Sequence, residues 1–449
     1  MANFVEEEIL RKIYKNIKAK LKTGADRINE EKFSRELDEN IRIIVNDIND
    51  FKFKVHKYKN IKIDDDREVV IPTIKDQLVA NYLKIILETE FHIKYPNRNK
   101  LIRELIIHLE ELLNMELEDN GISFIKIDLS KCFNNISKPL ILKKLKTSLI
   151  VNPFNEYQYY LIKEFLKYQK KGIPQGIGIS NFLLEFFLKD FDNEMKKISS
   201  KICYYARYVD DIIILFNGFP SYKEQEEVIE KIHKILAKYQ LKENKEKSIN
   251  LDLKAGVNRK YFSFLGYDFN IEESKKLKIE ISSKKLDKLF KKINFCFSQY
   301  LKNKNLYLLR ERLNFLLTNI KYKKKKYYYI KNRVQLYSKK KIVYLGIFNT
   351  YNYADKNIIY EKIKKYLEDI LLNEEYSDIR EKIINEFCNT SLLERYVSIP
   401  ASESKYLEKL KKFNKKFYKK IEKTKGNFTL NREYLKKVYL RNIMLKNHK

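Results

Sequence analysis

Two adjacent aspartates, Asp210 and Asp211, interrupt an otherwise aromatic and aliphatic stretch of the chain at residues 203–216. The aromatic and β-branched residues on both sides predict two buried strands joined by a tight turn that carries the carboxylates. Unpaired buried charge is costly, and a divalent cation bound by oxygen ligands would remove that cost. The doublet therefore predicts a metal site at a hairpin turn, of the kind that handles phosphates.

The composition indicates a chain with a substantial core and without a membrane span. With 449 residues, 44% of them hydrophobic, the chain is long enough for about two to four domains. No apolar run approaches the ~18–20 residues that a membrane span requires, and the acidic N-terminus lacks the apolar region of a signal peptide. The four cysteines are far apart and form no C-x-x-C pair, which favours a reducing cytosol over a disulfide or zinc framework.

The formal net charge of +32 predicts a polyanionic partner, because Lys and Arg neutralise phosphates. Compositional drift is an alternative, since Lys, Ile and Asn are enriched throughout the chain. The basic residues nevertheless cluster at residues 323–326, just before three tyrosines, at residues 339–341, and in residues 401–449. Lysines beside tyrosines suit phosphate contact and base stacking on single strands, although each run alone is more typical of a solvated helix face.

The middle third of the chain alternates predicted strands with predicted helices, which is an α+β pattern. Upstream of it, residues 67–72 predict a short strand, and a helix begins at Ile74 with Thr73 or the Lys75-Asp76 pair as its cap. After Asn270 the pattern becomes helical and basic, with one further strand at 341–351. The other predicted strands are 122–129, the two beside the doublet, 247–252 and 261–269; the other predicted helices are 101–117, 137–149, 153–168, 180–197 and 221–239.

A third aspartate completes the set that the doublet requires. Asp128 ends a predicted strand, and a sheet that joins this strand to the hairpin would place all three carboxylates together. Three carboxylates can hold two Mg²⁺ ions about 3.5–4 Å apart; Mn²⁺ is an alternative metal, and backbone oxygen beside Asp128, at Leu129, would add a ligand. Taken alone, Asp128 is more simply a turn residue or a helix cap, but a doublet inside an apolar run is not.

These residues resemble the sequence boxes of a reverse transcriptase. Residues 208–211 match its Tyr-x-Asp-Asp box, and residues 128–133 match its first catalytic box, in which an aromatic residue follows the Asp by five positions. The resemblance implies that Phe133 is the steric gate that excludes a ribose 2′-hydroxyl, although core packing also accounts for this ring. Residues 172–180 match the third box, which implies that Gln175 and Gly176 lie against the incoming nucleotide and the template base.

Three further segments extend the resemblance. Residues 241–248 resemble the next box, which implies that Lys247 is the general acid for the departing pyrophosphate, although a lysine-rich chain can supply such a residue by chance. Residues 261–267 resemble the primer-grip hairpin. Upstream, Arg67 and residues 71–76 resemble the strand from which an Arg contacts the triphosphate. Lys59 is a second candidate for that contact, but a solvated surface position suits Lys59 better.

The resemblance covers residues 51–270 and implies a right-hand polymerase of the α+β class. It implies fingers at residues 1–118, a palm with the catalytic boxes at 119–270, a helical thumb-like region at 271–338 and a basic helical C-terminal domain at 339–449. The implied reaction is Mg²⁺-dependent attack of a primer hydroxyl on the α-phosphate of a dNTP, with Asp128, Asp210 and Asp211 as metal ligands.

A narrower resemblance is to the bacterial defence-associated and abortive-infection reverse transcriptases, with the type 3 defence-associated system as the best-matching subgroup. It rests on residues 176–181, 183–192, 204–211 and 343–351. This resemblance implies an RNA template or non-coding RNA, dNTPs, a DNA product and a bacterial cytoplasmic location. It also implies a homo-oligomer or a complex with a partner defence protein.

Other functions remain open from the sequence alone. A retron-like or intron-derived reverse transcriptase would copy one structured RNA, and an adjacent RNA gene or intron would identify it. A template-independent or protein-primed DNA polymerase would make a product that does not follow an added template. A nucleic-acid-binding scaffold without catalysis is disfavoured, because a scaffold has no reason to keep three metal-binding carboxylates.

Overall fold

The computed structural model describes residues 5–64, 67–114, 122–150, 156–218, 222–253, 260–272, 276–330, 335–389, 392, 395–398, 403–413, 439 and 443. The chain divides into two compact units, Met1–Val257 together with Tyr327–Ser338, and Asn258–Lys326 together with Lys339–Lys449. The boundary after Val257 lies inside the segment expected to form the palm. The expected four-part division therefore remains a prediction.

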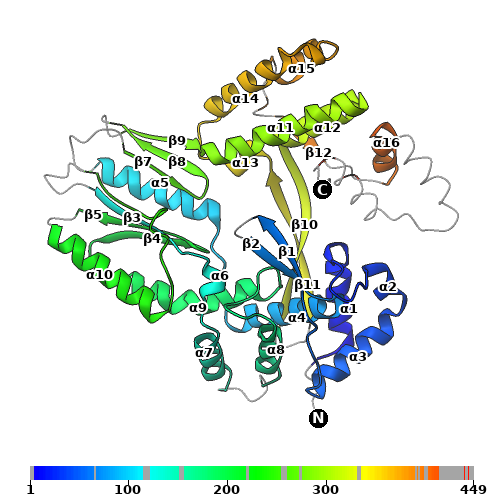
Figure 1. Cartoon of the computed structure of the whole chain (residues 1–449), viewed down its shortest axis with the longest axis vertical. Helices are drawn as coiled ribbons and strands as arrows, with labels where there is room; N and C mark the ends of the chain where they lie inside the picture. The colour runs from blue at the N-terminus through cyan, green and yellow to red at the C-terminus, as the bar shows by residue number, and fades with distance from the viewer. Residues whose placement is uncertain are drawn as a thin grey trace. The chain divides into compact units, whose positions relative to one another are not determined.

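The first unit is built around a four-stranded antiparallel sheet with the strand order β4-β5-β3-β6. Its strands are β3 (Ile122–Asp128), β4 (Ile202–Tyr208), β5 (Asp211–Asn217) and β6 (Ile249–Leu253), which confirms the strands predicted around the three aspartates. Residues 212–216 of β5 are all buried, because helices cover both faces of the sheet. Figure 1 shows α5 (Arg98–Asn114) on one side and α9 (Ser180–Met195) and α10 (Tyr222–Lys238) on the other.

A short hairpin and several helices precede this sheet in the chain. β1 (Lys59–Asp64) and β2 (Arg67–Ile71) form an antiparallel two-stranded sheet. α4 (Ile74–Glu90) begins as predicted, because the Thr73 hydroxyl accepts a hydrogen bond from the Asp76 N–H at 3.2 Å. The remaining helices of this unit are α1 (Glu7–Ile17), the 3-10 turn η1 (Lys18–Lys20), α2 (Glu30–Arg35), α3 (Leu37–Asn49), α6 (Cys132–Asn135), α7 (Lys138–Ile150) and α8 (Glu156–Lys167).

The second unit has its own antiparallel sheet, formed by β7 (Lys260–Phe264), β8 (Tyr267–Ile271) and β9 (Leu277–Ile281). β7 and β8 form the predicted hairpin through a two-residue turn at Leu265 and Gly266, whose φ angles are 48° and 82°. Positive φ at both positions matches the twist of a tight hairpin. The helices of this unit are α11 (Ser283–Asn303), α12 (Leu306–Leu317), α13 (Ile347–Thr350), α14 (Lys356–Leu371), the 3-10 turn η4 (Glu374–Tyr376), α15 (Arg380–Phe387) and α16 (Glu403–Phe413).

The last third of the chain is helical as predicted from α11 to α16, except at two long strands. The second of these strands confirms the strand predicted at 341–351 only in residues 341–345, because a helical turn begins at Ile347. β10 (Asn319–Ile330) pairs with β11 (Gln335–Leu345) and, in parallel, with β12 (Tyr396–Ser398). The expectation of a helical region up to residue 338 is therefore wrong from Asn319 onward. Tyrosines and β-branched residues favour a paired strand, and the lysine runs at 323–326 and 339–341 obscured that signal. The side chains of these lysines lie outside the described residues, as does most of the basic segment 401–449.

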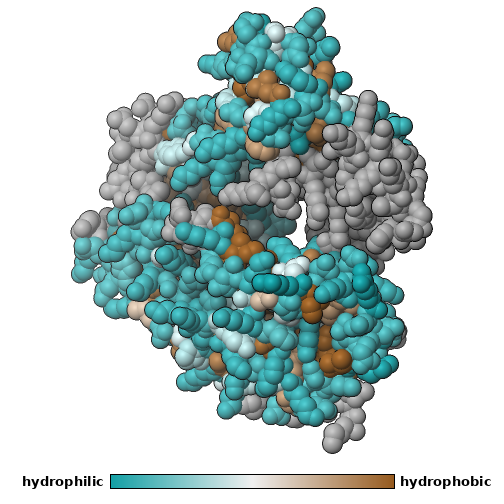
Figure 2. Space-filling model, turned by 45° about the vertical axis from the view of Figure 1, so that its right-hand side comes forward, coloured by the Kyte–Doolittle hydropathy of each residue, from teal (hydrophilic) through white to brown (hydrophobic). Residues whose placement is uncertain are grey.

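No helix in the described ranges combines the length and the apolar character that crossing a bilayer requires. The face drawn in Figure 2 is mostly hydrophilic, and its apolar residues gather in small patches. In the first unit, buried apolar side chains form a core that joins the N-terminal helices, α9 and the central sheet.

Candidate active site

The central sheet brings the three predicted aspartates to one edge. Tyr208 pairs with Asp211 across the turn between β4 and β5, and Asp211 pairs in turn with Asp128 at the end of β3. Opposite residues of an antiparallel pair have Cβ atoms about 4.5–5.5 Å apart. The Leu129 N–H also donates a hydrogen bond to the Asp210 carbonyl oxygen at 2.9 Å. The structure therefore places Asp128, Leu129 and the doublet side by side, as the sequence predicts.

The electrostatics of this edge are those of crowded carboxylates. Burial, and after it the negative charge of Asp210, raise the pKa of Asp211 to about 6, while Lys126 acts in the opposite direction. A second acid beside a buried acid disfavours ionisation of both, and a divalent cation that prefers oxygen ligands would reverse that effect. The donor chemistry therefore fits Mg²⁺ or Mn²⁺. Among the described residues, no group of three or more His, Cys, Asp or Glu side chains has the geometry of a metal site, so the two-metal arrangement remains a prediction.

Lys247 reaches this edge from the segment that follows α10. Its Nζ lies 3.9 Å from Oδ2 of Asp128, and the side chain is largely exposed. The segment is fixed by its backbone, because the Asn244 N–H donates to the Asp128 carbonyl oxygen at 2.7 Å. The Ser248 hydroxyl accepts from the Asp128 N–H at 3.3 Å. The structure therefore places Lys247 beside the carboxylates, as predicted, and adds two supports, Asn244 and Ser248, that the sequence does not reveal.

The predicted steric gate, Phe133, lies in the short helix α6 directly after the β3 strand end. Lys131, with φ 43°, turns the chain into this helix. Phe133 is half-buried and packs against the main core. The Ile173 N–H donates to the Phe133 carbonyl oxygen at 2.8 Å. Phe133 therefore joins the strand end that carries Asp128 to the glycine-rich loop at residues 172–178. Its ring has the packing role that the sequence left open, and the steric-gate role remains a prediction.

The glycine-rich loop docks on β2. The Val70 N–H donates to the Gln175 carbonyl oxygen at 2.8 Å. Gly176 has φ 104°, and a Cβ at this position would lie 2.5 Å from the Val70 carbonyl oxygen. The loop therefore joins Gln175 and Gly176 to the strand that begins with Arg67. The side chain of Arg67 lies outside the described residues. Lys59 pairs with Ile71, at the other end of β2, so the structure does not bring these two candidates together.

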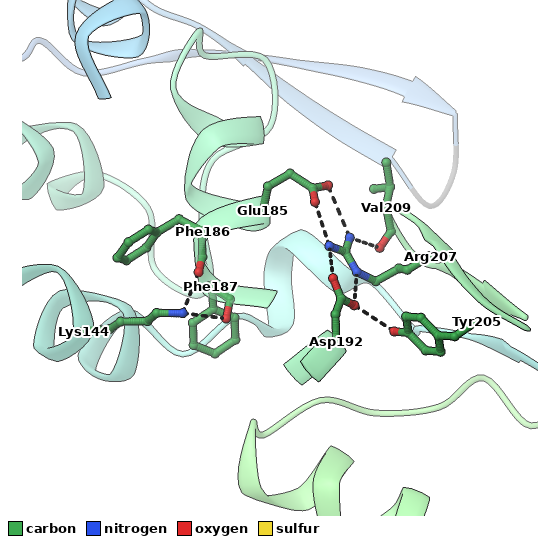
Figure 3. Close-up of polar contacts among 8 residues, drawn as sticks. All are labelled: Lys144, Glu185, Phe186, Phe187, Asp192, Tyr205, Arg207 and Val209. Atoms are coloured by element: carbon green, nitrogen blue, oxygen red, sulfur yellow. Dashed lines mark hydrogen bonds and ion pairs between the residues drawn. The ribbon is translucent and has the colours of Figure 1, made fainter. Parts of the chain in front are cut away.

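Arg207 is a residue of the site that sequence reasoning missed. Its side chain is only 3% exposed and forms ion pairs with Glu185 at 2.7 Å and Asp192 at 2.8 Å, both on α9 (Figure 3). The only signal in the sequence was an Arg inside an aromatic and apolar run. Its partners are 22 and 15 positions away in the chain, so only the tertiary structure identifies them.

Comparison with protein families identifies the domain that holds this site. Residues 56–269 match the family of reverse transcriptase (RNA-dependent DNA polymerase). The chain therefore contains a reverse transcriptase domain, and every candidate residue from Arg67 to Lys247 lies within it. The match confirms the expected enzyme class and, with the mixture of helices and sheets, the right-hand polymerase fold.

Two proteins of Saccharomyces cerevisiae are similar over part of the chain. The COX1/OXI3 intron 1 protein is 28% identical over 200 residues, which are 42% of this chain and 22% of that protein. The COX1/OXI3 intron 2 protein is 23% identical over 291 residues, which are 50% of this chain and 33% of that protein. The chain thus spans a third or less of the length of these relatives.

Two solved telomerase structures are also similar. The apo telomerase of Candida tropicalis, truncated from its C-terminal domain, has a TM-score of 0.40 and 15% identity over 50% of this chain and 54% of that chain. The telomerase of Candida albicans in complex with a fragment of telomeric RNA has a TM-score of 0.41 and 13% identity, over 93% of this chain and 66% of that chain.

Proposed function

We propose that the chain is an RNA-directed DNA polymerase that extends a primer with dNTPs. The observation that carries this proposal is the meeting of Asp128, Asp210 and Asp211 at one sheet edge inside a reverse transcriptase domain. In the reaction, the primer 3′-hydroxyl loses its proton to solvent, and its oxygen forms a bond to the α-phosphorus of a dNTP. The bond from that phosphorus to the bridging oxygen of the β-phosphate breaks, and pyrophosphate leaves.

The carboxylates would hold the metal ions that this reaction requires. Asp128, Asp210 and Asp211, with the carbonyl oxygen of Leu129, supply the oxygen ligands that Mg²⁺ or Mn²⁺ prefers. Bound metal would lower the pKa of the 3′-hydroxyl and neutralise the triphosphate. Lys247 lies 3.9 Å from the Asp128 carboxylate, and we assign it the proton that the departing pyrophosphate takes up.

The glycine-rich loop and Phe133 would form the nucleotide side of the site. The loop is hydrogen-bonded to both Phe133 and β2. Gln175 and Gly176 are therefore connected to the strand that begins with Arg67. In this proposal Arg67 binds the triphosphate, Gln175 and Gly176 contact the base pair, and the Phe133 ring excludes a ribose 2′-hydroxyl. The N-terminal helices and β1–β2 would be the fingers, the central sheet the palm, and α11 and α12 part of a thumb.

Asp210→Asn tests the reaction. Loss of a metal ligand removes several kcal/mol of charge stabilisation, so we expect primer extension to fall by about 10²–10³-fold. The melting temperature should be unchanged or higher, because the negative charge of Asp210 disfavours ionised Asp211. The matched control is Asp190→Asn, an exposed aspartate that pairs with Lys144 at 2.8 Å. If Asp210→Asn extended a primer as fast as the wild type, the proposed mechanism would be wrong.

The cellular role is a separate proposal with two candidates. The motif-level resemblance in residues 176–181, 183–192, 204–211 and 343–351 supports a bacterial antiphage enzyme that acts in the cytoplasm, as an oligomer or with a partner defence protein. The two similar yeast intron proteins support an intron-derived enzyme that copies one structured RNA. Both roles use the same polymerase chemistry, and we do not choose between them.

Two experiments separate these roles: sequencing of the RNA and DNA that co-purify with the protein, and a phage-restriction assay. A single defined RNA with its complementary DNA would support the intron-derived role. Phage restriction by the wild type, lost in Asp210→Asn, would support the defence role. Homopolymer or random DNA would support template-independent synthesis and would contradict RNA-directed copying.

A further inference from the structure

The turn that presents the doublet contains a backbone conformation that its residue does not favour. Val209 has φ 62°, in the left-handed region. A two-residue hairpin turn needs positive φ and normally places Gly, Asn or Asp there, whereas a β-branched residue in this region is an outlier. Strain of this kind persists only when the surrounding structure imposes it. The turn therefore needs a contact that holds it.

Arg207 supplies that contact. Its Nη1 donates a hydrogen bond to the Val209 carbonyl oxygen at 3.2 Å (Figure 3). The same guanidinium donates from Nη1 and Nη2 to both oxygens of Glu185, at 3.2 and 2.7 Å, and from Nε and Nη2 to both oxygens of Asp192, at 2.8 and 2.9 Å. A planar guanidinium in two such forks has a fixed orientation. Its remaining contact, to Val209, is then equally fixed.

The two carboxylates that hold Arg207 lie on α9, the helix that follows the glycine-rich loop. Asp192 is itself oriented by the Tyr205 hydroxyl, which donates to its Oδ1 at 2.7 Å. A buried ion pair adds little net stability, because desolvation offsets the attraction between the charges. Stability alone therefore does not account for a fully paired arginine at this place. A requirement for one orientation of the turn accounts for it.

We propose that Arg207 is a positioning residue of the polymerase site: held by Glu185 and Asp192, it fixes the Val209 carbonyl and so sets the direction in which the doublet points. The next carbonyl, that of Asp210, is fixed by the Leu129 N–H at 2.9 Å. Two consecutive peptide groups of the turn are thus tethered, one to α9 and one to the end of β3. The inference rests on the proposed polymerase function.

Arg207→Lys tests the proposal, because lysine keeps the charge but cannot form the two forks and the third contact together. We expect kcat for primer extension to fall by about 10–100-fold, since a misplacement of about 1 Å in a catalytic group costs roughly that much. The KM for dNTP should stay within about threefold, because the hydrogen bonds of Arg207 go to α9 and to the Val209 carbonyl oxygen. Glu185→Gln is the second variant, and we expect the same direction with a smaller loss.

The variant Val209→Gly distinguishes a loss of turn orientation from a general loss of stability. Glycine adopts positive φ without strain, so the turn should depend less on Arg207 in its presence. The loss caused by Arg207→Lys should shrink to about threefold when Val209→Gly is also present, in a double-mutant cycle. Lys144→Gln is the matched control, because Lys144 also anchors α9, through the Phe186 carbonyl oxygen at 2.6 Å and Asp190 at 2.8 Å, without touching the turn (Figure 3). It should leave kcat unchanged.

Two readouts do not depend on catalysis. Electron paramagnetic resonance of Mn²⁺ titrated alone should show about tenfold weaker binding to Arg207→Lys, as for other residues that orient metal ligands. Hydrogen exchange of the peptide 203–216 should be faster in Arg207→Lys than in Lys144→Gln. An inactive wild type with these differences intact would contradict the polymerase function and keep the positioning role. Unchanged Mn²⁺ binding and exchange, or the same loss with and without Val209→Gly, would overturn the proposal.

Discussion

The pKa of a carboxylate at the catalytic edge depends on the charges around it. Burial and the neighbouring Asp210 raise the pKa of Asp211 to about 6, and the attraction of Lys126 and Lys247 lowers it. Lys247 is the more exposed of the two cations, and its Nζ lies 3.9 Å from Oδ2 of Asp128. An exposed ammonium at this distance contributes little to stability. In the proposed reaction its role is to donate the proton that pyrophosphate takes up.

Lys247→Gln should therefore lower kcat without changing the fold. We expect a fall of about 10²-fold, the usual contribution of a general acid, and a melting temperature within about 1 °C of the wild type. The measurement is single-turnover primer extension at saturating dNTP. Lys245→Gln is the matched control, an exposed lysine two positions away in the same segment. Equal rates for the two variants would remove the general-acid role from Lys247.

The sequence predicts residues that act through side-chain chemistry better than residues that act through contacts. Asp128, Asp210 and Asp211 stand out because unpaired charge is costly at the ends of buried strands. Ser248 and Asn244 do not stand out, since they act on the backbone of Asp128, and a Ser or Asn in a turn is ordinary. Arg207 carried a weak signal, but its pairing with α9 is a property of the fold.

At the level of elements, the glycine-rich loop connects the catalytic edge to β2. Its first glycine, Gly172, has φ 69° and lies against the backbone of Phe133 and Asn134, and Gly176 lies against Val70. The loop thus needs glycine at positions 172 and 176 for close backbone approach. Gly178 differs, because a Cβ there would meet the Ala80 carbonyl oxygen at 3.3 Å and its φ is not in the left-handed region.

Gly176→Ala should displace the loop from β2, whereas Gly178→Ala should be tolerated. At Gly176 the new Cβ would lie 2.5 Å from a backbone oxygen with φ 104°, and such strain costs about 1–3 kcal/mol. We expect a lower melting temperature and a KM for dNTP raised about tenfold, with Gly178→Ala within about threefold of the wild type. Steady-state kinetics and thermal melting of both variants measure this. An unchanged KM in Gly176→Ala would separate the loop from nucleotide binding.

Element prediction succeeded where one periodicity dominates a segment and failed where two signals compete. β3, β4 and β5 are apolar runs of strand length with turn residues at their ends, so their pattern has one interpretation. β10, which the sequence analysis does not predict, and β11, which it predicts only in residues 341–345, instead alternate lysine runs with tyrosines. Lysine runs favour a solvated helix, tyrosines favour a strand, and pairing between the two strands decides the outcome.

At the scale of the whole molecule, charge is the property most directly linked to a partner. Most of the net charge of +32 belongs to the second unit, which has 45 Lys and Arg against 20 Asp and Glu, whereas the first unit has 47 against 40. The face in Figure 2 is mostly hydrophilic. The two-unit division differs from the four predicted regions because sequence patterns identify boxes and helices, whereas contacts across the fold define units. The β7–β9 sheet shows this, since its boxes resemble the palm while its contacts place it in the second unit.

A polyanion partner implies that binding weakens steeply with salt. If the chain neutralises about six or more phosphates, affinity for an RNA–DNA primer–template should fall about 10³-fold or more between ~50 and ~200 mM KCl, through counterion release. Fluorescence anisotropy with a labelled duplex measures the slope. The control is a peptide nucleic acid of the same sequence, whose neutral backbone releases no counterions, so its binding should be weak and nearly independent of salt. If the affinity for the charged duplex did not change with salt, the net charge of +32 would be a matter of composition alone. Lysines and arginines that do not contact phosphate release no counterions when the duplex binds.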